Sequence, residues 1–347
     1  MFLHDEYEAL QGGAGILDRS GRGRIRLTGG DRRTYLQGLL TNDILALAPG
    51  QGCYAALLTP NGRMISDMRV SELGGMVLMD LPGATAADVC RRLADFIFTE
   101  DVQVEDARGA LGHLGLYGPL AAAVLSRVLT PRAGDQEPAA VEEGAARMTV
   151  GQNAERNFSG TPVIVVRSDD FGVPGFELFP RADVAGDLNQ ALALAGAVNV
   201  SAETAEVTRV EAGRPEFGPD MDEGTIPLEA GIEERAISLT KGCYVGQEII
   251  IRVLHRAGGR VARHLVGLAG EAGSDGFSRG ERVHRGDRDV GVVTSAVFSP
   301  RLQLPIALAY VHRDHVEPGI VLQAGSADAS GPRRATIVAL PFIPSAS

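Results

Sequence analysis

The sequence has no tryptophan, and phenylalanine and tyrosine bring its aromatic share to only 5%. Its hydrophobic cores must therefore be built mainly from aliphatic side chains. No apolar stretch reaches the roughly 18 residues that a membrane-spanning helix requires. The N-terminus is acidic where a signal peptide would be basic and then apolar. We therefore expect a cytoplasmic protein that does not interact with a membrane.

Cysteine is also scarce, since Cys53, Cys90 and Cys243 lie far apart and form no closely spaced pair. This odd, sparse set fits a reducing compartment and provides no disulfide framework. It also excludes a zinc or iron–sulfur site built from four thiolates of one chain. The close pair His312 and His315 has no third ligand nearby, so we expect no metal site.

Several nucleotide and hydrolase motifs are missing: there is no Walker loop, no Gly-x-Ser-x-Gly elbow and no Rossmann glycine fingerprint. The net charge of −11 disfavours binding of nucleic acid by bulk charge. Residues 249–270 are an exception, because they contain no acid but include Arg252 and Arg256. This block predicts either an anion site or a solvated basic face, and it lacks the interleaved aromatics of an RNA-binding surface.

Glycine (44 residues) and proline (18 residues) are abundant, which indicates many turns between short elements. Alternating patterns predict strands over 51–59 and 64–70, joined by a hairpin turn at Asn61-Gly62. Asp31 is expected to cap a helix that continues to about Leu40.

Residues 85–97 form an amphipathic pattern that places Val89, Leu93 and Phe96 on one buried helix face. From Leu265 onward nearly every pattern is strand or turn, which predicts a small β-barrel. Helices and strands alternate before that point, so the fold class is α+β.

Two stretches have the composition of linkers. Residues 131–144 are polar and acidic and contain proline and glycine, and residues 270–280 are similar.

The most unusual segment is Lys-Gly-Cys-Tyr-Val-Gly-Gln-Glu at 241–248. Apolar periodicity resumes at Val245, so a helix is expected to begin near Gly246. A thiol at Cys243 would lie beside that helix N-terminus and two residues from the Lys241 ammonium, and both favour a thiolate. The alternative is a cysteine packed as a small hydrophobic residue in a tight turn.

Three further charged residues are candidates for ligand binding. Asp67 alternates with Arg69 on one strand face, so its carboxylate pairs with that arginine, is simply exposed to solvent, or binds a polar ligand. Glu177 lies in a predicted strand, where it either points to solvent or faces a ligand. Arg209 precedes a helix end at Gly213 and either anchors a ligand or forms a surface salt bridge.

The sequence resembles the folate-binding YgfZ family, which is related to the T-protein (aminomethyltransferase) of the glycine cleavage system. The resemblance rests on the eight-residue cysteine motif, preceded by Arg209–Gly213 and Ile226–Gly231. Weaker supporting stretches follow the expected order and cover most of the chain: residues 35–43, 59–67, 175–177 and 290–295.

The resemblance implies a ring of mixed α/β subdomains around a tetrahydrofolate pocket, with a C-terminal β-barrel. The folate-binding region would span residues 1–265, with two subdomains that divide within 131–146, and the barrel would span 266–347. The implied folate contacts are Asp67, Glu177, Arg209, Tyr244, Gln247 and Arg252, and the implied catalytic residues are Cys243 and Lys241. An acid would bind the pterin ring and Arg209 the anionic tail, with Arg252 as a second candidate for the tail.

Two departures from the T-protein pattern separate the functional hypotheses. The chain has Gly62-Arg63 and Ser66-Asp67 where the T-protein has paired glycines and paired aspartates, and it carries the cysteine motif. Both favour a tetrahydrofolate-binding accessory protein that supports assembly or repair of iron–sulfur enzymes, with those enzymes as protein partners. The alternative is a folate-dependent aminomethyltransferase or methyltransferase, and a third hypothesis is a structural module with a vestigial pocket. Unaided turnover would distinguish an enzyme from the other two.

Overall fold

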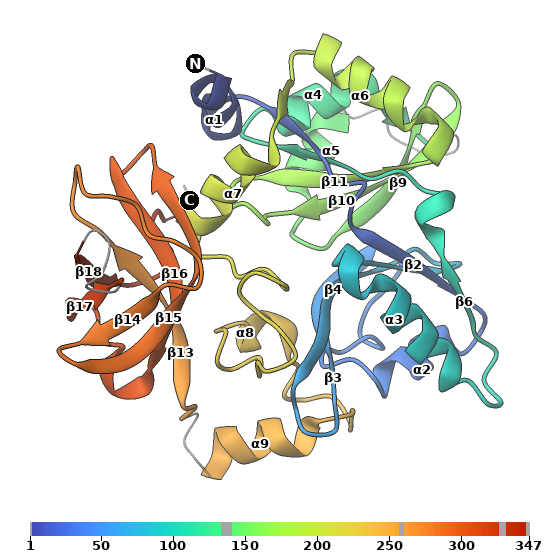
Figure 1. Ribbon diagram of the computed structural model, residues 1–347. Helices are drawn as coiled ribbons and strands as arrows, with labels where there is room; N and C mark the ends of the chain where they lie inside the picture. Colours follow the sequence, from blue (N-terminus) through green and yellow to red (C-terminus); the bar gives the residue numbers. More distant parts are fainter. Residues whose placement is uncertain (1, 133–140, 257–259, 326–330, 345–347) are drawn as a thin grey trace. The chain divides into compact units, whose positions relative to one another are not determined.

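The computed structural model describes residues 2–132, 141–256, 260–325 and 331–344 (Figure 1). The chain forms two compact units. The first contains Met1–Leu58, Ile65–Ala205 and Arg235–Val245, and the second contains Thr59–Met64, Glu206–Glu234 and Gly246–Ser347. None of the helices in the described ranges has the length and apolar character needed to cross a membrane.

A seven-stranded mixed sheet forms one layer of the first unit. Its strand order is β12 (Val198–Val200), β1 (Gly15–Asp18), β7 (Leu114–Tyr117), β11 (Gly175–Pro180), β10 (Thr161–Ser168), β9 (Asn153–Phe158) and β8 (Thr130–Pro131). Only the β1–β12 pair is parallel among the strand pairs described. The strand predicted around Glu177 is confirmed as β11.

Helices cover one face of this sheet: α4 (Ala121–Val128), α5 (Val141–Arg147) and α6 (Ala185–Leu194) (Figure 1). Their buried side chains are aliphatic or alanine, including Leu125 and Leu188, and they pack on strand residues such as Val163 and Val165. This confirms the expectation of aliphatic cores. The remaining helix at the start of this unit is α1 (Phe2–Gly12).

A five-stranded sheet forms the second layer of the same unit. Its order is β3 (Gln51–Leu58), β4 (Met64–Glu72), β5 (Val77–Leu81), β2 (Gly23–Thr28) and β6 (Gln103–Asp106). Helices α2 (Arg32–Gln37) and α3 (Gly83–Asp95) contribute to its core. Leu78 from this sheet packs against Ile164, Val166 and Phe179 from the seven-stranded sheet. The two sheets therefore share an apolar contact that buries the second face of β10.

The turn between β3 and β4 confirms the Asn61-Gly62 prediction. The Gly62 N–H donates to the Thr59 carbonyl at 2.9 Å, and the Thr59 N–H donates to the Arg63 carbonyl at 2.8 Å. Gly62 has a φ of 70°, which favours glycine. A side chain at this position would also press on Ile249, whose Cβ would lie 3.0 Å from the new carbon.

Two helix predictions need correction. The helix predicted to reach Leu40 ends at Gln37. Its expected cap, Asp31, makes no capping hydrogen bond and instead accepts the Asp101 N–H at 2.9 Å. In α3, Val89 and Leu93 are buried as predicted, but Phe96 lies beyond the last turn and is 55% exposed. Both errors arise at helix ends, where contacts distant in sequence determine the chain path.

The second unit contains the predicted barrel, which is closed. Its order is β13 (Arg263–Ala269), β16 (Leu304–His312), β15 (Arg288–Ser299), β14 (Arg282–Arg285), β17 (Val321–Ala324) and β18 (Arg333–Val338). The predicted linker at 270–280 is wrong as a domain linker, because it joins β13 to β14 within this barrel.

Three helices precede the barrel: α7 (Ala202–Glu211), α8 (Glu233–Ala236) and α9 (Gln247–Arg256). Val210 of α7 packs on Ile306 and Leu308 of the barrel wall. Gly213 follows α7 with a φ of 63°, as the predicted helix end requires. The other predicted linker spans residues 131–144, of which residues 133–140 lie outside the described residues. The strands before and after this linker, β8 and β9, both belong to the seven-stranded sheet. The division of residues 1–265 stays a prediction.

Candidate functional site

Asp67 lies on β4 with its carboxylate almost fully buried, at 8% exposure. Its Oδ2 accepts a hydrogen bond of 2.6 Å from the Tyr54 hydroxyl on the neighbouring strand β3. Its Oδ1 is buried and has no hydrogen-bond partner within the described part of the chain. Burial and the adjacent Asp67 charge raise the pKa of Tyr54 well above its ordinary value, so Tyr54 stays a donor. Asp67 therefore has one oxygen held in place by Tyr54 and one buried oxygen that lacks a donor among the described residues.

The alternative that Asp67 pairs with Arg69 is wrong. The Arg69 Nη1 lies 3.3 Å from Asp80 Oδ2, and the Arg69 Nε donates to Asp170 Oδ1 at 3.0 Å. Asp80 is directly opposite Arg69 in the β4–β5 ladder, which explains the choice of partner. Residues 67 and 69 share a strand face, but the nearer acids lie on neighbouring elements.

A cavity of about 380 Å³ opens beside Tyr54 in the first unit. This volume falls in the range of small-molecule sites. Its wall combines apolar and charged side chains: Tyr54, Arg69, Val150, Arg167, Ser168 and Asp170 are among the lining residues. Val150 is 59% exposed, so it presents an apolar surface that a flat ligand can cover.

Glu177 lies on β11 and is only 1% exposed. Its Oε2 lies 2.6 Å from His113 Nε2, and its Oε1 accepts from the Tyr117 hydroxyl and lies 3.2 Å from Arg19 Nη2. Burial opposes ionisation of Glu177, but the charge of Arg19 and the contact with His113 outweigh it and lower its pKa. The alternative that Glu177 points to solvent is wrong.

The contacts of Glu177 continue to the cavity wall. Arg19 also lies 3.1 Å from Asp170, which lines the cavity and holds Arg69. Glu177 is therefore connected to the cavity through Arg19 and Asp170. Its predicted contact with folate stays a prediction.

The same region brings together three side chains of metal-binding type, Asp80, His113 and Glu177, with ligand atoms within 4.8 Å of one another. Arginines already compensate these carboxylates: Arg22 Nε lies 2.6 Å from Asp80, and Arg19 contacts Glu177. A divalent cation would be repelled by these guanidinium groups. The cluster is therefore better described as a buried ion network.

Lys241 is 7% exposed and lies within the first unit. Its Nζ donates to the carbonyls of Gln37, Leu40 and Asn42 at 2.7, 2.6 and 2.9 Å. Burial lowers the pKa of Lys241 to about 8. All three N–H donors of the ammonium are thus used to anchor the cysteine motif on residues 37–42. The catalytic role predicted for Lys241 stays a prediction.

The rest of the cysteine motif divides between surface and interior. Cys243 is exposed, whereas Tyr244 is 7% exposed, and its buried hydroxyl has no hydrogen-bond partner among the described residues. The helix expected near Gly246 is confirmed as α9, which begins at Gln247. Arg252 is exposed on that helix, and its Nη2 lies 2.8 Å from Glu248. The proposed roles of these residues stay predictions.

Arg209 is buried in the second unit rather than at the surface, so the surface-salt-bridge alternative is wrong. Its Nη1 lies 2.7 Å from Asp220, its Nε donates to Glu206 at 2.7 Å, and its Nη2 donates to Ser295 at 2.8 Å. Burial would lower the pKa of Arg209, but Glu206 and Asp220 raise it. These contacts tie α7 to strand β15 of the barrel.

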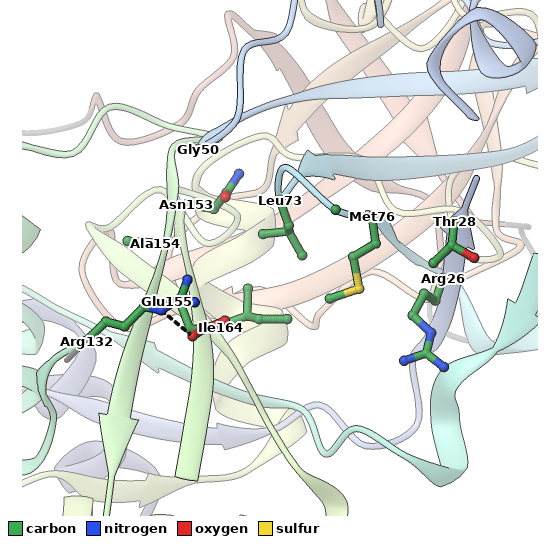
Figure 2. A pocket seen from close by; sticks show the side chains of 11 residues that line it. Arg26, Thr28, Gly50, Leu73, Met76, Arg132, Asn153, Ala154, Glu155 and Ile164 are labelled. Carbon is green, nitrogen blue, oxygen red and sulfur yellow. Dashed lines mark ion pairs between the residues drawn. The ribbon is translucent and has the colours of Figure 1, made fainter. Parts of the chain in front are cut away.

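A second cavity, of about 430 Å³, lies elsewhere in the first unit (Figure 2). Leu73, Met76 and Ile164 form its apolar part, and Arg132 pairs with Glu155 at 3.2 Å. None of its lining residues was predicted from the sequence. The predicted site residues do not line the cavity beside Tyr54 either, but Asp67 contacts Tyr54 in its wall, and Glu177 is connected to its Asp170 through Arg19. That cavity is therefore the candidate site.

Two known domain families match the sequence and together cover most of the chain. The family described as the GCVT N-terminal domain matches residues 1–241, and the glycine cleavage T-protein C-terminal barrel domain matches residues 263–343. The chain belongs to this glycine cleavage T-protein family.

Similar proteins cover nearly the whole chain. The aminomethyltransferase of Corynebacterium jeikeium is 30% identical over 353 residues, which cover 97% of this chain and 90% of that protein. The aminomethyltransferase of Rubrobacter xylanophilus is 34% identical over 312 residues, which cover 88% of this chain and 78% of that protein. The glycine cleavage system aminomethyltransferase T from Bartonella henselae has a similar fold. Its TM-score is 0.84 at 22% identity, covering 99% of this chain and 90% of that one.

Sequence reasoning missed three residues of the site: Tyr54, His113 and Arg167. Tyr54 was visible only as one residue of an alternating strand, and nothing in that pattern pairs it with Asp67. His113 was a lone histidine before an apolar run. The strand order is the signal that places Tyr54 near Asp67 and His113 near Glu177, because it brings β3 next to β4 and β7 next to β11.

Proposed function

We propose that this protein binds tetrahydrofolate against its first unit and acts as a one-carbon transferase of the aminomethyltransferase type. The single observation that carries the proposal is Asp67, a buried carboxylate with one oxygen held by Tyr54 and the other without a partner. The named relatives support the transferase over the accessory protein as the first candidate.

The residues fit a reduced pterin ring. Such a ring carries adjacent N–H donors, and a buried acceptor without a partner is costly until a donor reaches it. Asp67 Oδ1 is such an acceptor, and Tyr54 prevents the carboxylate from rotating away from it. The cavity next to Tyr54 adds apolar surface from Val150. Tetrahydrofolate, when bound, supplies the nitrogen atoms that take up the one-carbon unit.

The binding part of the proposal is tested by calorimetric titration with tetrahydrofolate under anaerobic, reducing conditions. We expect Asp67→Asn to bind at least about tenfold more weakly, because it loses a charge-assisted hydrogen bond while keeping the shape of the side chain. The matched control is Asp95→Asn, since Asp95 is 62% exposed and pairs with Arg91 on α3. Equal affinity of the wild type and Asp67→Asn would contradict the proposal.

The transferase part is tested by ammonia release from an aminomethyl donor in the presence and absence of tetrahydrofolate. We expect folate-dependent release by the wild type and a large loss in Asp67→Asn. Binding without any turnover would refute the transferase and leave a folate-binding protein.

The second candidate is the accessory protein of the YgfZ type, which supports iron–sulfur enzymes. The observation that favours it is Cys243, exposed on a segment that Lys241 anchors through three carbonyls. In this case Cys243→Ser should leave tetrahydrofolate affinity unchanged but fail to restore iron–sulfur enzyme activity in cells that lack the protein. Full restoration by Cys243→Ser would count against this candidate.

A further inference from the structure

In the wall of the cavity beside Tyr54, one arginine has no carboxylate partner among the residues that the structure describes. Arg167 lies at the end of β10, is half-buried, and lines the cavity. Among the described residues its one side-chain hydrogen bond runs from Nη1 to the Gly175 carbonyl at 3.1 Å, and its Nε is buried without an acceptor. Partly buried arginines are normally paired with an anion, so this cation is undercompensated.

The neighbouring charges do not supply that anion. In the adjoining network Arg19, Arg22 and Arg69 contact the three carboxylates Asp80, Asp170 and Glu177, so that network is balanced without Arg167. Burial lowers the pKa of Arg167, and attraction to Asp169 offsets this only in part. Arg167 is therefore the cation of this wall that has most to gain from an added negative charge.

The backbone around Arg167 holds the residue firmly. Its N–H donates to the Gln152 carbonyl at 2.8 Å, and its own carbonyl accepts the Gly151 N–H at 3.0 Å. The guanidinium carbon lies 5.1 Å from the centre of the Phe176 ring, which supports one face of the planar group. The guanidinium is thus oriented before any ligand arrives, which lowers the cost of binding.

We propose that Arg167 forms an anion subsite of this cavity and that the ligand it takes carries a carboxylate. A guanidinium matches a carboxylate through two parallel hydrogen bonds. The carboxylate belongs either to the glutamate tail of a folate, in which case this inference rests on the proposed function, or to a free amino acid.

The carboxylate contact is thereby assigned to Arg167 and not to Arg209, the residue that the sequence predicted for it. Arg209 is already bound by Asp220, Glu206 and Ser295 in the second unit. An incoming carboxylate at Arg209 would have to displace carboxylates that are part of the fold. At Arg167 it would displace no carboxylate that a described residue supplies.

The test measures calorimetric affinities of the full chain for four probes. Tetrahydrofolate carries both ring and tail, 6-methyltetrahydropterin carries only the ring, N-(4-aminobenzoyl)-L-glutamate carries only the tail, and glycine is a small free amino acid. The variants are Arg167→Gln, which removes the charge, and Arg167→Lys, which keeps it. The matched control is Arg181→Gln, because Arg181 is 61% exposed and pairs only with Asp183 among the described residues.

We expect Arg167→Gln to weaken tetrahydrofolate and the tail probe about tenfold or more, with less than about twofold change for the ring probe. Arg167→Lys should restore part of the loss. If glycine alone shows this dependence, the carboxylate comes from a free amino acid. Equal weakening of ring and tail probes, or no weakening of any probe, would overturn the subsite.

The outcomes also separate the two proposals. If the tail probe binds through Arg167 but neither tetrahydrofolate nor the ring probe binds, the subsite stands and the folate function fails. If tetrahydrofolate binds equally to the wild type and Arg167→Gln, the folate function stands and the subsite fails.

Discussion

The buried carboxylate of Glu177 should be one of the most important single groups for the stability of the first unit. Both of its oxygens are used, by His113 and by Tyr117 with Arg19, and its exposure is 1%. Glu177→Gln keeps the size of the side chain but removes the charge and turns one acceptor into a donor. Arg19 would then be buried with less compensating charge.

Removing one partner of a buried ion pair costs about 3–5 kcal/mol. We therefore expect Glu177→Gln to lower the free energy of unfolding of the first unit by that amount. At about 2–4 °C per kcal/mol for domains of roughly 150–250 residues, Tm should fall by roughly 6–20 °C. Urea and thermal unfolding followed by far-UV circular dichroism measure this, since the chain has no tryptophan for fluorescence.

Protonation of Glu177 in acid should reduce the difference in the free energy of unfolding between the wild type and Glu177→Gln. The folded-state pKa of Glu177 is lowered from 4.5, so the unfolded chain binds more protons below that pH and the stabilisation is lost as pH falls. Burial also lowers the pKa of His113 from 6.5, which makes folding less favourable as pH drops below that value. The contribution of the Glu177 charge to the stability difference between wild type and Glu177→Gln should therefore be constant above about pH 5 and shrink below pH 4.5.

The matched control is Glu105→Gln, in which the lost partner is also an arginine. Glu105 and Arg26 are 52% and 38% exposed, so this surface pair should contribute less than about 1 kcal/mol. The reasoning is refuted if Glu177→Gln costs no more than Glu105→Gln, or if its effect does not change in acid.

Three further predictions concern other parts of the chain. Lys241→Met should destabilise the first unit by about 3 kcal/mol in urea unfolding, because three carbonyls lose their donor; a loss below about 1 kcal/mol would contradict an anchoring role. Asp220→Asn should destabilise the second unit by about 3 kcal/mol by thermal unfolding, since it leaves Arg209 partly uncompensated, whereas Asp222→Asn should have a smaller effect. Gly62→Ala should cost about 1 kcal/mol or more through its positive φ and its contact with Ile249, and an unchanged urea midpoint would show that the turn relaxes freely.

Local sequence patterns were sufficient wherever the structure depends on near neighbours. The Asn61-Gly62 turn, the start of α9 after Gly246 and the end of α7 at Gly213 were all predicted, because each depends on the backbone preferences of a few adjacent residues. The closed barrel was also expected from strand and turn signals alone. The cysteine motif was singled out from the sequence and its functional role stays a prediction, whereas the anchoring of its lysine on residues 37–42 was not predicted.

Only the tertiary structure decided which charged groups meet. Asp67 contacts Tyr54 and not Arg69, and Arg69 contacts Asp80. In both cases the partner lies on a neighbouring strand, which is closer in space than the next residue on the same face of one strand. Glu177 meets His113, 64 residues away in sequence. A one-dimensional pattern records the spacing of charges but not the strand order, and burial makes pairing depend on distances in space. For that reason the sequence alone determined the class of fold. The arrangement of the ion pairs became apparent only in the folded chain, as did the lack of a carboxylate partner for Arg167 among the described residues.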